Sequence, residues 1–205
     1  MGYNLRTPGT PAGELRGMGF NSVNFKCHST GHCCKDVICL PTPWDVIRIS
    51  REIGADPAEF LDFITPDDIS GVDKNDPTWL EVDGKKYMMA LFRDKKGCHF
   101  LEPGTHRCSI YLSRPILCRL YPLRIQETKD GEFKGFTLHT NVGCPKNRDG
   151  VVEAAPLLAL YRQDRQHHQD YDELVEVFNQ RSYPGKKPED FVAMFMGSQH
   201  VTANA

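Results

Sequence analysis

Residues 27–34, with the sequence Cys-His-Ser-Thr-Gly-His-Cys-Cys, place three thiols and two imidazoles in one short stretch. Thiolates and imidazoles are the donors that bind zinc, iron and iron–sulfur clusters in proteins. The spacing matches neither a zinc ribbon with two Cys-x2-Cys knuckles nor a bacterial ferredoxin with cysteines at two-residue intervals. The stretch therefore predicts one edge of a metal site whose other ligands come from elsewhere in the chain.

Five more cysteines follow this stretch, and several of them stand beside turn-forming residues that can return the chain to it. Cys98 and Cys108 flank a Glu-Pro-Gly-Thr turn at 102–105, which would place them across from each other in a hairpin-like connection. The thiols that we predict as metal ligands are Cys27, Cys33, Cys34, Cys98, Cys108, Cys118 and Cys144. Cys39 is interpreted either as a small buried apolar side chain or as a spare ligand.

The number of cysteines allows more than one metal centre. Side chains that are adjacent in sequence tend to diverge. We therefore expect Cys33 and Cys34 to bind two different metals, or one of them to bind a metal while its neighbour only packs against other residues. Eight cysteines suffice for two four-thiolate sites. The histidines available as substitutes are His28, His32, His99 and His106. The predicted cofactor is therefore zinc or an iron–sulfur cluster, in one or more centres.

Two arginines are candidates for contact with this site. A zinc tetrathiolate and a four-iron cluster with four thiolates both carry negative charge, so both favour cationic neighbours. Arg114 and Arg119 lie within a few residues of Cys118. We interpret them as charge support for the thiolates; the alternative is that they recognise an anionic substrate.

The composition is that of a soluble globular protein, with 40% hydrophobic and 25% charged residues. The formal net charge of -2 offers no basic surplus for phosphate contacts, so we expect a protein or a small anion as partner and no nucleic acid. No apolar run is long enough to span a bilayer, and the N-terminus lacks the apolar core of a secretory signal. We therefore expect no membrane contact and a cytoplasmic protein, whose cysteines serve metal or redox chemistry rather than disulfides.

The elements that must position these residues are short, and they predict an α+β fold. We expect a small irregular cysteine-cluster domain with hairpins and packing helices, followed by C-terminal helices. The predicted parts are a flexible arm at 1–19, the metal-binding domain at 20–148 and a helical extension at 149–205 that packs on it. Alternation and turn residues predict strands at 20–26 and 37–40 and hairpins at 79–92 and 123–139. Start and stop signals predict helices at 43–53, 56–64, 114–117, 155–181 and 188–196.

Several single residues are interpreted as structural. Thr42 and Ser113 are the predicted N-caps of the helices at 43–53 and 114–117. Three aromatic side chains at helical spacing are expected in the core: Trp44, Phe60 and Phe63. His167 and His168 lack a ligand partner one turn away, so neither is expected to bind metal.

With these residues collected, the chain resembles the cysteine-cluster family often called YkgJ-like, whose domains chelate zinc or iron. The resemblance rests on the segment Cys98-His99-Phe100-Leu101, on Cys144, and on a long phrase from Cys108 to Pro122. That phrase reads Cys-x-Ile-Tyr-x2-Arg-Pro-x2-Cys-Arg-x-Tyr-Pro. The similarity spans roughly residues 20–148 and implies a metal-binding domain.

The chain departs from the family at one position. The family motif is Cys-x2-Cys-x2-Cys-Cys, and Thr30 stands where its second cysteine is expected. Cys39, His28 or His32 can replace the missing ligand, or one metal position stays open or absent. An open position would matter, because catalytic metals keep one and structural metals do not.

Three functions follow from these patterns. The first is a metal-binding module whose zinc or iron–sulfur centre organises a small domain. The second is a metal-dependent redox or protein-modifying enzyme that acts on a peptide or anion held by Arg114 and Arg119. Methyl transfer is one such modification by analogy, because the family's cysteine cluster also occurs in proteins similar to flagellin lysine N-methylases. The third is a metal carrier. No phosphate loop, nucleotide fingerprint or Ser–His–Asp order points to a common cofactor enzyme.

Overall fold

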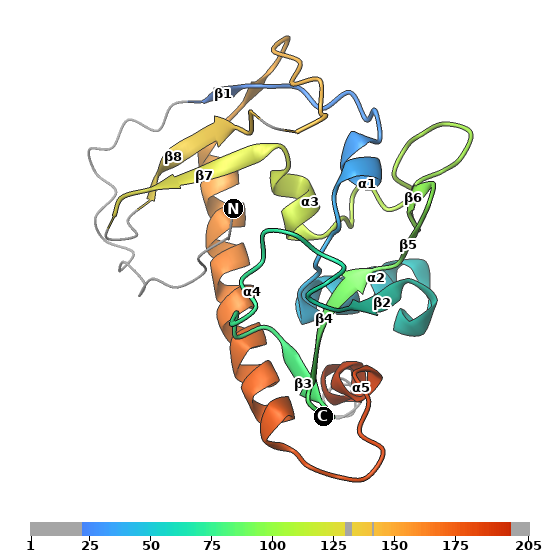
Figure 1. The fold of residues 1–205 in the computed structure, drawn as a ribbon. Coiled ribbons are helices and arrows are strands. Elements are labelled where there is room, and N and C mark those ends of the chain that lie inside the picture. The colour runs from blue at the N-terminus through green and yellow to red at the C-terminus, as the bar shows by residue number, and fades with distance from the viewer. Residues whose placement is uncertain (1–21, 130–132, 141, 198–205) are drawn as a thin grey trace, which may run out of the picture.

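The computed structural model describes residues 22–129, 133–140 and 142–197. Within these residues the fold is α+β, as predicted, with one long helix, several short helices and four small antiparallel sheets (Figure 1). The arm predicted at 1–19 lies outside the described residues.

The helices are α1 (His32–Asp36), α2 (Pro43–Ile53), the 3-10 turn η1 (Pro57–Glu59), α3 (Ile116–Leu120), α4 (Ala154–Gln180) and α5 (Glu189–Gly197). The strands are β1 (Val23–Asn24), β2 (Leu61–Ile64), β3 (Leu80–Val82), β4 (Lys85–Leu91), β5 (Arg93–Asp94), β6 (Gly97–Cys98), β7 (Leu123–Glu127), β8 (Phe133–Leu138) and β9 (Val151–Val152). Three two-stranded sheets pair β1 with β9, β5 with β6 and β7 with β8. The three-stranded sheet has the strand order β2-β4-β3.

Both predicted hairpins are confirmed. In the first, β3 and β4 are joined by Asp83 and Gly84, whose φ angles of 49° and 73° suit the tight turn expected of an Asp-Gly pair. In the second, β7 and β8 pair with Leu123 opposite Leu138, and the turn itself lies outside the described residues.

Helix α2 begins and ends as its sequence predicts. The Thr42 side chain accepts from the Asp45 amide, the Asp45 side chain accepts from the Thr42 amide, and Pro43 occupies the first helical turn. The helix ends at Gly54, with φ of 68° and an amide that donates to the Ser50 carbonyl.

Two predicted elements are wrong, and in the first of them tertiary pairing overrides the local pattern. The segment after Asp56 forms only the turn η1, although its predicted capping box is present. The chain then continues as β2, where Leu61 pairs with Leu91 of β4 and Phe60 is fully buried. The predicted strand at 37–40 does not form; the chain is irregular there, and Cys39 accepts a hydrogen bond from the Leu91 amide. Pairing with β4 thus decides the first segment, whereas the second makes a single hydrogen bond to β4 and forms no strand.

The helix predicted at 114–117 is displaced, and its predicted cap is wrong. Helix α3 begins at Ile116, directly after Pro115, and has no side-chain cap. Ser113 is buried before the helix, and its hydroxyl donates to the Ile110 carbonyl. The predicted helices at 155–181 and 188–196 are confirmed as α4 and α5.

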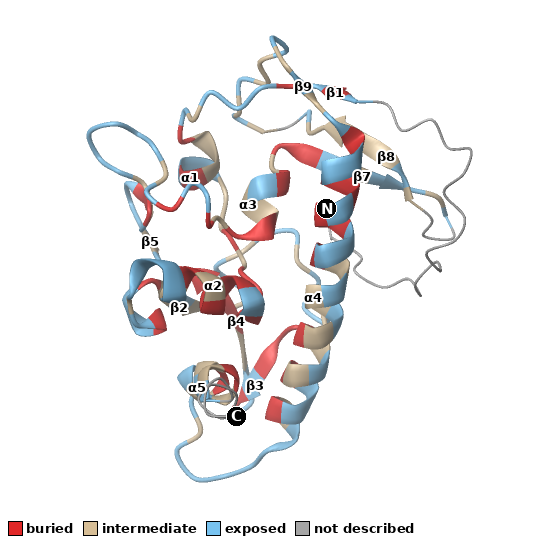
Figure 2. Ribbon diagram, turned by 180° about the vertical axis from the view of Figure 1, so that it is seen from behind, coloured by how far each residue is buried: buried red, intermediate tan, exposed pale blue. Residues whose placement is uncertain are grey.

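The core has two parts, and α4 contributes to both. The larger part joins residues of α2, β3 and β4 to the second half of α4 and to α5, and the smaller part joins β1, α3 and β7 to the first half of α4. The buried residues of α4 lie along one side of the helix (Figure 2). Phe60 lies in the larger part of the core and Phe63 packs against it, as predicted. Trp44 is 41% exposed, so its predicted core position is wrong.

Candidate metal centre

Cys33 and Cys34 are held by the short helix α1. Gly31 precedes the helix in the left-handed region, with φ of 72°, and its carbonyl accepts from the Cys34 amide at 3.0 Å. The two sulfurs lie 3.9 Å apart. The expectation that these neighbouring side chains diverge is therefore wrong.

Cys98 reaches Cys34 through a close approach of two backbone segments. Gly97 has φ of 131°, and a Cβ built on it would lie 2.8 Å from the Cys34 carbonyl oxygen. Only glycine leaves room for this approach. From the paired strand β5, Arg93 also donates to the Lys35 carbonyl at 2.6 Å. Strands β5 and β6 are thus fixed against α1, with Cys98 beside Cys34.

Cys108 arrives on the strand-like segment that follows the 102–105 turn. Cys108 is bridged to Leu101 rather than to Cys98, and the Ser109 amide donates to the Phe100 carbonyl at 2.9 Å. The same segment passes close to Gly31, where an added Cβ would lie 2.6 Å from the His106 carbonyl oxygen. This route places Cys108 against Cys34.

The Cys34 thiol is the centre of a group of four sulfurs. Its sulfur lies 3.9 Å from that of Cys33, and Cys108 and Cys98 are close enough to raise its pKa. We call Cys33, Cys34, Cys98 and Cys108 the inner group. Its members come from three separate segments, so no short motif contains it.

The remaining predicted ligands lie around the same place. A cavity of about 30 Å³ is lined by six of the seven predicted thiols, namely Cys27, Cys33, Cys34, Cys108, Cys118 and Cys144. The seventh, Cys98, contacts Cys34. The structure thus brings all seven together, while their role as metal ligands stays a prediction.

The charge states of the inner group follow from these contacts. Hydrogen bonding to Cys34 lowers the pKa of Cys33 to about 6 and that of Cys98 to about 7, and it also lowers the pKa of Cys108. The cation of Arg114 adds to the lowering at Cys33 and Cys108. Contact with these sulfurs, together with burial, raises the pKa of Cys34. Several inner thiols are therefore close to the thiolate form that binds metals.

The two arginines singled out from the sequence have different surroundings. Arg114 lines the cavity, and its guanidinium lies 3.7 Å from the Tyr111 ring centroid, with Nε donating to the Tyr111 carbonyl. Arg119 does not line the cavity. Burial and the nearby cations of Arg48 and Arg114 lower the pKa of Arg119. Of these two arginines, Arg114 therefore supports the thiolate charge, and Arg93 adds to it at Cys98.

The model of the CxxCxxCC family, described as "Putative zinc- or iron-chelating domain", matches residues 26–145. The chain belongs to this family. The match confirms the resemblance carried by the cysteine phrases and supports metal binding in general. Searches of the curated proteins and of the solved structures found no significant match. Among the described residues, no helix has the length and apolar character needed to cross a membrane.

Thr30, at the second cysteine position of the CxxCxxCC motif, lines the cavity. Its hydroxyl forms a hydrogen bond with Nδ1 of His32, which also lines the cavity, at 2.9 Å. His28 instead bonds Asp149 at 2.9 Å on the exposed surface. Cys39 is buried in the larger core and receives a hydrogen bond from the Cys118 thiol at 3.3 Å. His32 and Cys39 are thus the substitutes nearest to the cavity thiols.

The inner group fits a zinc ion in part. Among the described residues, no three His, Cys, Asp or Glu side chains already form a coordination sphere. The 3.9 Å between the sulfurs of Cys33 and Cys34 nevertheless matches the edge of about 3.8 Å expected for tetrahedral Zn–S bonds of about 2.3 Å. Ligand thiols lose their protons when a metal binds, and the cation draws the resulting thiolates together.

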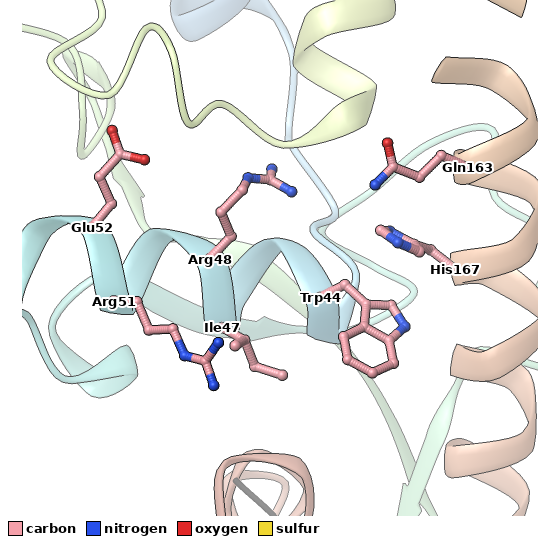
Figure 3. Close-up of a pocket in the computed structure, with 7 residues that line it drawn as sticks. All are labelled: Trp44, Ile47, Arg48, Arg51, Glu52, Gln163 and His167. Atoms are coloured by element: carbon pink, nitrogen blue, oxygen red, sulfur yellow. The ribbon is translucent and has the colours of Figure 1, made fainter. Parts of the chain in front are cut away.

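A larger hollow of about 500 Å³ lies away from the cysteines, between α2 and α4 (Figure 3). It is lined by Trp44, Ile47, Arg48, Arg51, Glu52, Gln163 and His167. Trp44 donates to Asp170 at 3.2 Å, and its ring lies 5.9 Å from that of His167. Trp44 therefore belongs to this hollow rather than to the core.

The sequence analysis missed two residues that shape the cysteine cluster. Gly97 permits the approach of Cys98, and its signal was a glycine directly before a predicted ligand. Asp45 accepts from the Ile116 amide at 3.2 Å, which connects α2 to the helix that carries Cys118. Its local signal was the Thr42-x2-Asp45 capping box.

Proposed function

We propose that the chain is a zinc-binding protein in which the inner group holds one ion. The observation that carries this proposal is the convergence of three sulfurs on Cys34 from α1, β6 and the segment at Cys108. Four thiolates complete a tetrahedral zinc site. In this site zinc connects segments that are far apart in the sequence.

Two dimensions favour a single ion over an iron–sulfur cluster. The cavity of about 30 Å³, which Cys33, Cys34 and Cys108 of the inner group line, has room for a small ion, and the sulfurs of Cys33 and Cys34 are only 3.9 Å apart. In a cluster the thiolates bind different iron corners, so the inorganic core keeps them further apart. Zinc therefore requires less movement of the cysteines.

A four-thiolate zinc site has a structural role. Because its ligands are brought together only in the folded chain, the free energy of zinc binding adds to the free energy of folding. Arg114, next to Cys33 and Cys108, offsets part of the negative charge. We therefore expect zinc to stabilise the contacts among α1, β6 and Cys108.

Metal analysis of anaerobically purified protein tests this function. The expected result is a colourless protein with one zinc per chain, and cobalt substitution should give the visible absorption of tetrahedral thiolate coordination. A brown protein with stoichiometric iron and acid-labile sulfide would establish an iron–sulfur centre in its place.

Two matched cysteine variants test the ligand assignment. Cys108→Ser removes an inner thiol and should abolish stoichiometric zinc. Cys27→Ser removes an exposed thiol that lines the same cavity but lies outside the inner group, and should retain zinc. Loss of zinc in Cys27→Ser with retention in Cys108→Ser would contradict the assignment.

A second function, as a metal carrier, is favoured by the thiols beside the inner group. Cys27 and Cys144 line the cavity without belonging to that group, and Cys27 is exposed. Such thiols give an ion an exchange path toward solvent. For a carrier, Cys27→Ser should slow zinc transfer to a chelator while leaving the equilibrium affinity unchanged. An unchanged transfer rate would leave only the structural role.

A further inference from the structure

We propose that Asp45 and Arg48 of α2 are positioning residues for the metal centre. They hold the backbone at 113–116 in place, and thereby place Arg114 and Cys118 in the wall of the cysteine cavity. This inference rests on the proposed metal function and identifies the part of the chain outside the cysteines that supports it.

Asp45 connects two helices through its carboxylate. The residue is almost fully buried, with 1% of its surface exposed. One oxygen, Oδ2, accepts from the amide and the hydroxyl of Thr42 and so closes the start of α2. The other, Oδ1, accepts from the Ile116 amide at 3.2 Å. A carboxylate that caps its own helix therefore also binds the first amide of α3.

Arg48 holds the residues just before α3. Its Nη2 donates to Asp45 at 2.6 Å, to the Arg114 carbonyl at 2.9 Å and to the Ser113 carbonyl at 3.3 Å. Figure 3 shows the side chain rising from α2 toward the backbone above it, on the opposite side from Ile47. Together, Asp45 and Arg48 bind an amide and two carbonyls of the segment 113–116.

The held segment carries two parts of the cavity wall. Cys118 follows Ile116 within α3 and lines the cavity. Arg114, whose carbonyl Arg48 binds, lines the same cavity as Cys33 and Cys108. Groups that fix the orientation of a metal site commonly change metal affinity by 10- to 100-fold when they are removed. We expect the lower end of that range for this pair, because it reaches the inner group through Arg114 and not through a ligand.

The carboxylate of Asp45 cannot be replaced by an amide. All four of its partners are donors: the amide and hydroxyl of Thr42, Nη2 of Arg48 and the amide of Ile116. An ionised carboxylate only accepts, whereas an asparagine directs two N–H bonds toward one pair of these donors. Asp45→Asn is therefore a nearly isosteric change that disrupts the contact.

Site-resolved alkylation tests this positioning in metal-free protein. In wild-type protein, Cys118 is packed against Cys39 and should react slowly with iodoacetamide, while the exposed Cys27 provides the internal reference for the reagent. Asp45→Asn and Arg48→Met should each raise the Cys118 rate severalfold relative to Cys27, because the segment that carries Cys118 opens more often. Arg48→Met keeps the capping box of α2, so it serves where Asp45→Asn fails to fold.

Zinc affinity is the second measurement, and Thr42→Ala is the matched control. Thr42→Ala removes the hydroxyl of the capping box but leaves Oδ1 of Asp45, with its bonds to Arg48 and Ile116, untouched. It should lower the melting temperature without changing Cys118 alkylation or zinc affinity. Asp45→Asn and Arg48→Met should displace Arg114 from the inner group and weaken zinc binding by roughly tenfold, measured by chelator competition.

The outcomes separate this inference from the proposed function. The inference is overturned if Asp45→Asn and Arg48→Met both keep the alkylation rate and the zinc affinity of the wild-type protein. It is also overturned if Thr42→Ala changes Cys118 alkylation and zinc affinity as much as these two variants do. If the wild-type protein binds no zinc, the proposed zinc function fails, and the alkylation rates alone decide whether Asp45 and Arg48 position Cys118.

Discussion

Thr30 is the residue at which this chain departs from the CxxCxxCC motif, and its side chain still faces the cysteine cavity. The hydroxyl is bound to His32 rather than left free. A hydroxyl is a poorer ligand for zinc than a thiolate. At this position of the cavity wall, the hard hydroxyl oxygen of Thr30 therefore stands where the motif has a soft thiolate.

A cysteine at position 30 should add a second metal site and leave the first unchanged. The inner group already supplies four thiolates to its ion, so we expect Thr30→Cys to bind a second zinc with Cys27, Cys118 and Cys144, which line the same cavity. Metal analysis measures the number of zinc ions per chain, and Thr30→Ser, which keeps the hydroxyl, is the control. The same zinc content in Thr30→Cys and Thr30→Ser would contradict this prediction.

Among the elements, β6 depends on a glycine at its contact with α1. We expect Gly97→Ala to lower the free energy of unfolding by about 1–3 kcal/mol, because the residue has φ of 131° and an added Cβ would meet the Cys34 carbonyl. The same change should weaken zinc binding by moving Cys98 away from Cys34.

Gly104 provides the matched control for this prediction. It lies in the turn between Cys98 and Cys108, and an added Cβ there meets nothing within 4 Å. Gly104→Ala should change stability by less than about 0.5 kcal/mol. Denaturant unfolding of both variants measures the difference, and equal stabilities would contradict the proposed close approach.

The contact between α2 and α4 contains a buried carboxyl that makes stability depend on pH. Burial raises the pKa of Asp164 to about 7, and the negative charge of Asp45 adds to the shift, while Arg165 opposes it. His168 lies 3.8 Å away, but burial lowers its pKa, so it does not supply a stable counter-charge near neutral pH.

The sign of this dependence follows from the direction of the shift. Below about pH 4 the Asp164 carboxyl is protonated in both the folded and the unfolded chain; between about pH 4 and 7 only the unfolded chain ionises it. Its contribution to stability is therefore full at low pH and is lost as the pH rises through 7, up to about 4 kcal/mol. In metal-free protein, the stability of wild type relative to Asp164→Asn should fall over this range in urea unfolding. A constant difference would show that Asp164 has an ordinary pKa.

Elements with local signals could be predicted from the sequence, and elements decided by distant partners could not. Thr42, Pro43 and Gly54 define α2, and Asp83-Gly84 defines a hairpin, because caps and turns depend on nearby residues. Strand β2 was predicted as helix because its pairing with β4 leaves no local trace.

The same distinction applies to the metal centre. Cysteine type and the family phrases sufficed to name the seven thiols that the fold brings together. The contact of Asp45 with Ile116 joins residues 71 positions apart, and the approach of Gly97 to Cys34 is equally a product of the fold. Neither contact can be inferred from spacing.

At the scale of the whole molecule, the cysteine cluster and the C-terminal helices share their packing. Five side chains of α4 and α5 lie in the larger core together with residues of α2 and the β2-β4-β3 sheet: Tyr171, Val175, Phe178, Phe191 and Phe195. The first half of α4 also packs in the smaller core, with β1, α3 and β7. The predicted domain at 20–148 thus buries its apolar residues against the predicted extension.

Truncation tests whether that domain is independent. We expect a fragment that ends at residue 148 not to fold cooperatively, with or without zinc, because it loses α4 and α5 and exposes Phe60, Leu80 and other residues that are fully buried in the chain. A single ion joins only the segments that carry its ligands, so zinc cannot replace this apolar contact. Circular dichroism during thermal unfolding is the measurement, and a cooperative transition in the zinc-loaded fragment would establish 20–148 as a self-sufficient domain.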